Sequence, residues 1–480
     1  MGELKQRTAR GLLWGGINNG IQQVLNLAFG IVLARLLDVE DYGMIGMLTL
    51  FSAVASALQE SGFTAALANK KEVRHEDYNA VFWFSTLMGA SLYLILFFCA
   101  PLIARFYDNP AVTPIARYLF LSFLLSSVGT AQNAYLFRNL MVKQRAMAQM
   151  PALFLSGCIG VLMAWRGMAY WGLATQTLVY IGVTQLFYWR YSPWRPTRHI
   201  DFHPLKSMFG YSSKLLITTL FTQLNNNLIN TLLGRFYTEK EVGDYSQAYK
   251  WNSMAATSIN GMIVSVAQPA LATVADHRDR QLAVFRKMLR FTAFLSFPLM
   301  LGLAFVSKEF VVIALGEKWM PSVSILQLLC IWGAFAPIAT LYTNLLLSKG
   351  KSDVYMWSTM SQCLLQLGAM LVCYPHGIHV MVVASVSISV GWLAVWHYFV
   401  HRETGLTLWH ALKDVVPFLV ITAISLAAGL VVAQSLTNLY VLLAVKILTV
   451  AAVYLLLMWL SNATIFRESI AYLRHVHKPS

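Results

Sequence analysis

The chain has 480 residues, of which 57% are hydrophobic and only 12% are charged. Soluble globular proteins carry roughly 25% charged residues, so this composition excludes an ordinary soluble domain and indicates a polytopic membrane protein. The formal net charge of +15 is compatible with nucleic-acid binding, but the distribution of the positive residues along the chain argues against it.

Long apolar stretches follow one another along the whole chain. Each is near the roughly 20 residues that a membrane crossing requires and lacks the alternation of a strand, which predicts transmembrane helices. We expect an all-α integral membrane protein with fourteen transmembrane helices, over residues 12–36, 42–66, 79–104, 112–136, 147–165, 168–189, 212–236, 243–273, 289–315, 321–347, 353–373, 376–400, 410–433 and 438–460.

The first predicted helix contains an unusual polar segment, GGINNGIQQVLNLAFG at residues 15–30. Asn18, Gln22 and Asn26 fall on one face of this helix, with two further amides beside them. Amides in an apolar helix either line a polar cavity or bond neighbouring helices together. For one helix taken alone, both interpretations are open.

Lys and Arg residues indicate the orientation of the chain. With residue 1 on the cytoplasmic side, the inner segments hold 25 of the 36 Lys and Arg residues, and no outer segment holds more than two. Because short cytoplasmic loops are enriched in positive residues, we predict that both termini are cytoplasmic. The positive charge is then a signal of topology and of contact with anionic membrane lipids, and no nucleic-acid partner is indicated.

The longest inner segment, residues 190–208, is polar and contains three prolines. A shift of 200 residues aligns the helices on its two sides, with identities at Ile17/Ile217, Gln23/Gln223, Asn26/Asn226, Leu33/Leu233, Arg35/Arg235 and Gly43/Gly243. Six helices in each half imply a parallel repeat. We predict two pseudo-symmetric six-helix lobes, residues 1–200 and 201–408, followed by helices 13 and 14 with a cytoplasmic tail over 409–480.

The second half has its own amide-rich helix, which contains the segment TQLNNNLIN. Gln223, Asn226, Asn227 and Asn230 form a face that matches the one in the first half. Two polar stripes at equivalent positions favour a shared central cavity over the alternative of packing contacts.

Few charges lie inside the predicted helices. Lys250 shares a helix face with serine and threonine, Glu60 lies in the inner part of the second helix, and Asn260 is the repeat equivalent of Glu60. Amides donate and accept hydrogen bonds, and Lys supplies a point charge for phosphate or uronate. We therefore expect a hydroxyl-rich, anionic cargo. The alternatives are a Lys250 that snorkels at a helix end and a Glu60 that pairs with an inner-loop base such as Lys70.

Catalytic and metal-binding patterns do not emerge from the sequence. It contains no P-loop and no G-x-S-x-G motif, its five cysteines form no C-x-x-C pair, and its histidines lack metal-site spacing. We therefore predict a protein that is not an enzyme and that has no cofactor and no metal ion.

Several segments resemble one known family. LARLLDVEDYGMIGMLTL and QESGFTAALANKKEVRHEDYNAVFW in the first half, and LLGRFYTEKEVGDYSQAYKW and LGEKWMPSVSILQLLC in the second, are similar to the polysaccharide-transport family of Wzx-like oligosaccharide flippases of the MOP superfamily, especially its colanic-acid exporter branch. The resemblance implies two lobes around a central cavity and alternating access. It also implies a bacterial inner-membrane protein that flips undecaprenyl-pyrophosphate-linked oligosaccharide repeat units for lipopolysaccharide, capsule or exopolysaccharide. The polysaccharide polymerase and export machinery would be further partners.

Two rival functions stay open at this point. One is a multidrug or lipid-linked peptidoglycan-precursor exporter of the same superfamily, for which a more acidic, more apolar or more cationic cavity would be expected. The other is a membrane-embedded polysaccharide polymerase or ligase, which usually needs a large outer loop. No predicted outer loop here exceeds about ten residues.

Overall fold

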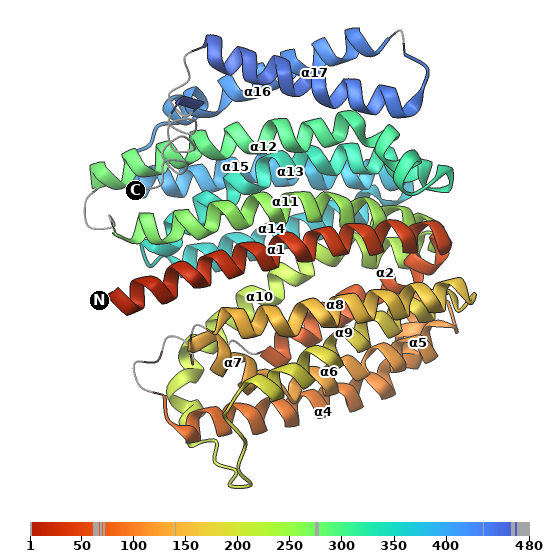
Figure 1. The fold of residues 1–480 in the computed structure, drawn as a ribbon, viewed down its shortest axis with the longest axis vertical. Helices are drawn as coiled ribbons and strands as arrows, with labels where there is room; N and C mark the ends of the chain where they lie inside the picture. Colours follow the sequence, from red (N-terminus) through yellow and green to blue (C-terminus); the bar gives the residue numbers. More distant parts are fainter. Residues whose placement is uncertain are drawn as a thin grey trace. The chain divides into compact units, whose positions relative to one another are not determined.

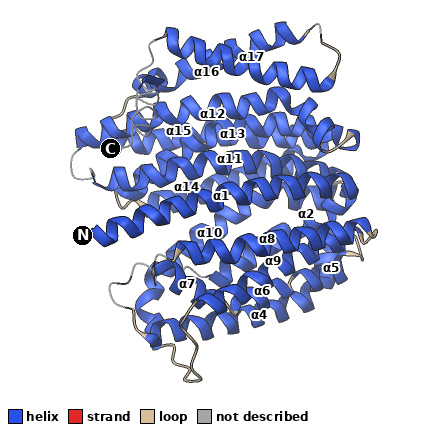
Figure 2. Ribbon diagram, viewed as in Figure 1, coloured by secondary structure: helices blue, strands red, loops and turns tan. Residues whose placement is uncertain are grey.

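The structure is a computed structural model, and it describes residues 2–60, 67, 70, 73–139, 141–273, 278–434, 436–461 and 466–467. The side chains of residues 2–18, 60, 206–215, 262 and 264–273 lie outside this description. Within the described residues the regular structure is entirely helical, without a strand (Figure 2). The chain divides into two compact units, Met1–Gly243 and Asp244–Ser480.

The first unit is a bundle of helices that pack against one another (Figure 1). Its helices are α1 (Gly2–Leu36), α2 (Val39–Glu60), α4 (His75–Tyr107), α5 (Val112–Leu119), α6 (Leu121–Ser127), α7 (Thr130–Arg138), α8 (Val142–Trp165), α9 (Ala169–Tyr191) and α10 (His203–Phe236), and it ends in the first turn of α11 (Glu239–Thr273). The long helix α10 packs along α2 and also contacts α4.

The second unit contains the rest of α11 and the remaining helices (Figure 1). These are α12 (Arg278–Ala314), the 3-10 helix η1 (Glu317–Trp319), α13 (Met320–Ser348), α14 (Ser352–Cys373), the 3-10 helix η2 (Tyr374–His376), α15 (Ile378–Thr404), α16 (Leu408–Ala433) and α17 (Leu439–Leu460). Helix α12 contacts α13, α15, α16 and α17.

The helices overlap the predicted segments, although α1 and α12 begin ten and eleven residues earlier than predicted, and residues 61–66 of the predicted segment 42–66 lie outside the described residues. Residues 112–136 were expected as one helix, but they form α5, α6 and α7, with a bend of 47° between Val112–Ser127 and Thr130–Arg138. Among the described residues, eight helices are long and apolar enough to cross a membrane, or nine if this bent pair is one span. The count of fourteen spans therefore stays a prediction, because five further helices, α1, α9, α10, α11 and α14, are not among these candidates.

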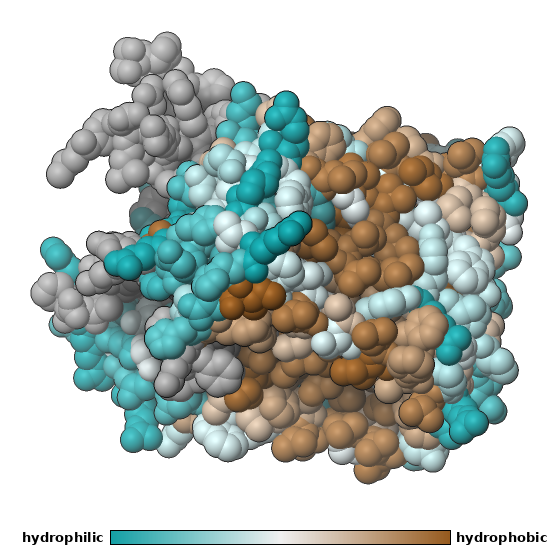
Figure 3. Space-filling view, turned by 90° about the horizontal axis from the view of Figure 1, so that it is seen from below, coloured by the Kyte–Doolittle hydropathy of each residue, from teal (hydrophilic) through white to brown (hydrophobic). Residues whose placement is uncertain are grey.

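Apolar side chains lie on the outside of the helices. Figure 3 shows them across the middle of the displayed face, with hydrophilic residues on either side. On α4 the exposed apolar residues include Leu87, Leu94, Ile95, Phe98 and Leu102. An apolar outer surface between two polar edges is stable only against lipid, so the protein is a multi-pass membrane protein.

Ion pairs join the last two helices to α12. Arg286 donates hydrogen bonds of 2.6 and 3.1 Å to the two carboxylate oxygens of Asp414 on α16. Lys446 on α17 donates a 2.7 Å hydrogen bond to Glu309, and both of these side chains are nearly buried. Removing one member of a buried pair costs about 3–5 kcal/mol, which applies to Lys446 and Glu309. The side chain of Arg286 is 32% exposed, so its pair with Asp414 contributes less.

The polar segment before α10 is held on the first unit. The side chain of Asn79 on α4 donates a 2.5 Å hydrogen bond to the carbonyl of His199 and accepts a 2.9 Å bond from the amide of Thr197. The indole of Trp83 donates to the carbonyl of Thr197 at 2.7 Å. The segment is not helical, so its backbone groups need other hydrogen-bond partners. These side chains supply partners for two of its carbonyls and one of its backbone amides.

Candidate polar transport site

The repeat with an offset of 200 residues is visible in the backbone. Helix α1 ends at Leu36 and α2 begins at Val39, while α10 ends at Phe236 and α11 begins at Glu239. The amide of Asp38 donates to the carboxylate of Asp41 at 2.9 Å, and the amide of Thr238 donates to the carboxylate of Glu241 at 3.0 Å. Both second helices thus begin with the same carboxylate cap at the third helical position.

Two glycines bring these turns together within the first unit. A Cβ atom on Gly43 would overlap the carbonyl oxygen of Glu239, and a Cβ atom on Gly243 would overlap the carbonyl oxygen of Val39. Since 39 and 239 are also equivalent positions, each copy of the turn contacts the other in the same way. This reciprocal contact is the pattern that a two-fold relation between repeats produces.

The amide face of α1 is partly exposed and partly bonded to α8. Asn26 is exposed, whereas Gln22 is half-buried and donates a 2.9 Å hydrogen bond to Gln149. Gln149 in turn donates to the hydroxyl of Tyr188 on α9 at 3.1 Å. The side chain of Asn18 lies outside the described residues. One predicted site residue therefore serves helix packing, while another is accessible.

The amide face of α10 follows the same pattern of exposure. Asn226 is exposed, Gln223 and Asn227 are half-buried, and Asn230 is only 4% exposed. Asn227 donates a 2.9 Å hydrogen bond to the carbonyl of Gln223, one turn earlier in its own helix. The accessible part of this face is thus centred on Asn226, the repeat equivalent of Asn26.

Lys250 and Asn260 lie in the second unit, on α11. Lys250 is half-buried, and its Nζ lies 5.7 Å from the centroid of the Trp251 ring, which is itself buried. Asn260 is half-buried, and its Oδ1 has no hydrogen-bond partner in the described part of the chain. Glu60 is the last residue of α2, and its side chain lies outside the described residues. The shared cavity formed by all these residues stays a prediction.

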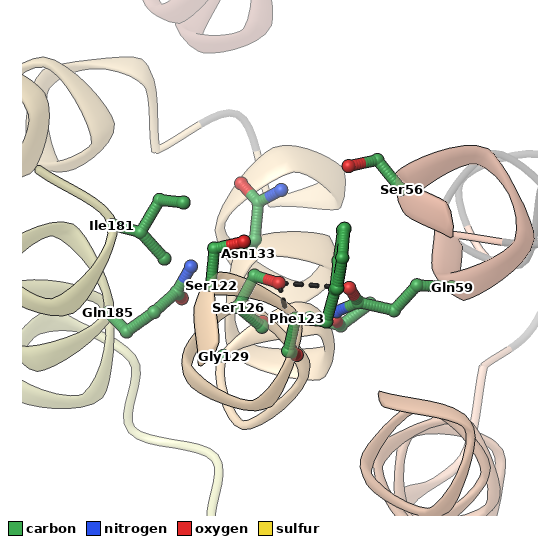
Figure 4. Close-up of a pocket in the computed structure, with 10 residues that line it drawn as sticks. Ser56, Gln59, Ser122, Phe123, Ser126, Gly129, Asn133, Ile181 and Gln185 are labelled. Atoms are coloured by element: carbon green, nitrogen blue, oxygen red, sulfur yellow. Dashed lines mark hydrogen bonds between the residues drawn. The ribbon is translucent and has the colours of Figure 1, made fainter. Parts of the chain in front are cut away.

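The structure also contains a polar pocket that was not predicted from the sequence. It has a volume of about 310 Å³ and lies between α2, α6, α7 and α9, within the first unit (Figure 4). Seven of its ten lining residues have hydroxyl or amide side chains: Ser56, Gln59, Ser122, Ser126, Thr130, Asn133 and Gln185. Phe123, Gly129 and Ile181 complete the lining.

A signal for this pocket was present in the sequence. The segment SSVGTAQN at residues 126–133 places several hydroxyl and amide groups around a glycine inside an apolar stretch. Polar residues around a break in a transmembrane segment are typical of binding sites in transporters. The partners Gln59 and Gln185, however, come from helices distant in sequence, so the pocket itself required the tertiary structure.

Neutral hydrogen-bonding groups dominate these polar regions. Among the described residues no cluster of three or more His, Cys, Asp or Glu side chains could hold a metal ion. Amides and hydroxyls both donate and accept, which suits ligands with many hydroxyl groups. The class of protein defined by these features is a helical membrane protein that contains a repeated helix–turn–helix and uncharged polar sites.

Comparison with known proteins assigns the family. The chain belongs to the polysaccharide biosynthesis protein family, whose model matches residues 32–324. It is 26% identical to the lipopolysaccharide biosynthesis protein WzxC of Escherichia coli K12, over 73% of this chain and 72% of that protein. It is 25% identical to the teichuronic acid biosynthesis protein TuaB of Bacillus subtilis 168, over 75% of each chain.

Solved structures show the same fold at low sequence identity. The lipid II flippase MurJ in an inward closed conformation has a TM-score of 0.76 at 14% identity, over 95% of this chain and 100% of that one. An inward-facing multidrug resistance MATE family transporter of the MOP superfamily has a TM-score of 0.64 at 14% identity, over 80% of this chain and 96% of that one. The predicted all-α membrane fold is confirmed.

Proposed function

We propose that the protein moves lipid-linked oligosaccharide repeat units, carried on undecaprenyl pyrophosphate, from the inner to the outer leaflet by alternating access. The observation that carries this proposal is the pair of equivalent amide faces in a member of the polysaccharide biosynthesis family. The fold shared with a lipid II flippase and with MATE transporters supports it. A relative from Rhizobium meliloti 1021 that is 21% identical, the succinoglycan biosynthesis transport protein ExoT, supports transport of a saccharide.

Amide faces suit a cargo that must be both bound and released. Each hydrogen bond to a sugar hydroxyl contributes only about 0.5–1.5 kcal/mol net, because it replaces a bond to water. Exposed amides such as Asn26 and Asn226 can therefore hold several hydroxyls together without trapping the saccharide. A single cation such as Lys250 adds attraction for a phosphate or an acidic sugar.

The orientation is part of the proposal. With both termini in the cytoplasm of a bacterium and the chain in its inner membrane, the basic segments face the side where positive charge is retained. Reporter fusions at residues 205 and 480 are expected to give cytoplasmic signals. A periplasmic signal at either position would contradict the fourteen-helix topology.

Deleting the gene tests the function directly. We expect lipid-linked repeat units to accumulate at the inner leaflet and the surface polysaccharide to disappear. Accumulation of a lipid-linked peptidoglycan precursor would instead support the precursor exporter. Single repeat units that reach the surface without being joined would support the polymerase.

Lys250 is the residue at which charge should matter most. In this proposal Lys250→Ala removes the attraction for the anionic part of the cargo, so the amount of surface polysaccharide falls while protein level and membrane insertion stay normal. Lys250→Arg keeps the charge but changes its shape, so it retains more export than Lys250→Ala. Full export by Lys250→Ala at single-copy expression would contradict the binding role.

A further inference from the structure

We propose that the pocket between α2, α6, α7 and α9 binds one uncharged sugar residue. Its volume of about 310 Å³ is at the lower end of ligand pockets, which span about 300–1,000 Å³, so it suits a single ring rather than a repeat unit. The further role of this pocket as a subsite for the saccharide of the cargo rests on the proposed function, whereas the binding of a sugar in the pocket is independent of that function.

The chemistry of the lining excludes a charged ligand. None of the ten lining residues is Asp, Glu, Lys, Arg or His. A phosphate or uronate would lose its hydration there without gaining a positive partner, and a divalent cation would find no carboxylate. Hydroxyl and amide groups, together with the apolar side chains of Phe123 and Ile181, instead match a ring that has polar hydroxyls and apolar C–H groups.

Two acceptor atoms at the pocket require donors. The Oδ1 of Asn133 and the Oε1 of Gln185 are buried and have no hydrogen-bond partner in the described portion of the chain. By contrast, the Oε1 of Gln59 accepts a 2.9 Å hydrogen bond from the hydroxyl of Ser126 (Figure 4). A sugar supplies hydroxyl donors to the two open acceptors, and it also accepts from the amide nitrogens.

The backbone creates room for one of these acceptors. The Oε1 of Gln185 lies where a Cβ atom on residue 129 would stand, so Gly129 leaves space for this amide in the position that it adopts. Gly129 also lies at the break between α6 and α7. The backbone N–H of Asn133 donates a 2.9 Å hydrogen bond to the carbonyl of Gly129. The break thus places Asn133 at the pocket, while Gln185 reaches the pocket from α9.

The position of the pocket fits the loading side of the proposed transport. Ser56 and Gln59 lie near the end of α2, Asn133 lies in α7, and Gln185 lies near the end of α9. All three helices lead into segments that the Lys and Arg distribution places in the cytoplasm. A sugar would therefore enter from the side on which lipid-linked saccharides are assembled.

Protection of an introduced thiol tests the binding. Ser56 is exposed at the pocket, so Ser56→Cys in a background without the five native cysteines should react with a small maleimide in the purified full chain. A panel of neutral hexoses at ten times the dissociation constant should slow this reaction by about tenfold, by mass action. Equal concentrations of glucuronate or sodium chloride should not slow it.

Matched amide variants locate the bound sugar. Gln185→Ala should abolish the protection, whereas Gln176→Ala, an amide on the same helix outside the pocket, should retain it. Protection by sodium ions alone, protection that survives Gln185→Ala, or reaction unaffected by every neutral hexose would each overturn the proposal. If the thiol does not react at all, saturation-transfer NMR of the native protein with the hexoses decides: a signal lost in Gln185→Ala supports the site, and no signal overturns it.

The two levels of the proposal fail separately. If the native protein binds hexose in the pocket but gene deletion leaves lipid-linked repeat units unchanged, the transport function is wrong and the sugar site stands. If deletion blocks export but no neutral hexose binds, the pocket is not a sugar site and the transport function stands.

Discussion

At the ends of α1 and α10 the chain makes the same turn, but the polar side chains that precede the two turns have different partners. Both turns leave two residues between their helices and begin the next helix with a carboxylate cap. In α1 the side chain of Gln22 bonds to Gln149 on another helix, whereas in α10 Thr222, at the equivalent position, donates to the carbonyl of Thr218 in its own helix.

The difference separates two kinds of constraint. A turn that packs backbone against backbone tolerates no Cβ atom, so Gly43 and Gly243 are identical in the two copies. An amide has several donors and acceptors and finds a partner in many surroundings. The turns thus require glycine at single positions. The amide faces require only polar side chains and the same pattern of exposed positions.

The largest loss of stability is expected from substitutions at the two glycines of the turns, Gly43 and Gly243. Gly43→Ala and Gly243→Ala should each destabilise the protein by about 1–3 kcal/mol, because the added methyl group overlaps a backbone carbonyl that cannot move alone. The thermal midpoint of the purified protein measures this loss. Gly20→Ala on α1, where no heavy atom lies within 4 Å, is the matched control and should be neutral or slightly stabilising. If all three variants behave alike, the reciprocal contact does not exist.

Cysteine labelling examines the two amide faces. In a cysteine-free background, Asn26→Cys and Asn226→Cys should react with a small polar maleimide about tenfold faster than Asn230→Cys, because exposed thiols react and buried ones do not. Fast reaction at both positions supports water along both faces. Slow reaction at both would favour the interpretation that the amides serve packing.

The smallest loss of stability is expected from substitutions at the carboxylate caps of α2 and α11. Asp41→Ala and Glu241→Ala each remove a carboxylate that accepts a backbone hydrogen bond, so each should cost about 1 kcal/mol in thermal unfolding. Equal losses in the two copies would confirm that the caps are equivalent. A loss of stability in only one copy would show that the two caps share their geometry but contribute differently to the free energy of unfolding.

The sequence was sufficient to predict most helices, because apolar length decides where a chain can lie in lipid. The prediction of 438–460 differs by one residue at its start from Leu439–Leu460. The beginnings of other helices were placed too late: α1 starts at Gly2 rather than 12, and α12 at Arg278 rather than 289. Lys, Arg and Gln are good helix formers, so these helices continue beyond the apolar stretch.

The candidate sites were predictable only in part. Periodicity placed Asn26 and Asn226 at equivalent positions in the two copies of the repeat, and both positions are exposed. It could not show that Gln22 bonds to Gln149, because nothing in the sequence indicates that α1 packs on α8. The pocket at Gly129 was missed for the same reason: its amides converge from three helices.

The packing of α10 along α2 has a consequence for the newly made chain. The first compact unit ends at Gly243, which is 183 residues beyond Glu60, the last residue of α2 (243 − 60). At a synthesis rate of about 5–20 residues per second, α2 is made roughly 9–37 s before its partner α10 and the contact at Gly243 are complete. During that interval the ribosome-bound chain presents unpaired helix surface, so the first repeat depends on the second to finish folding.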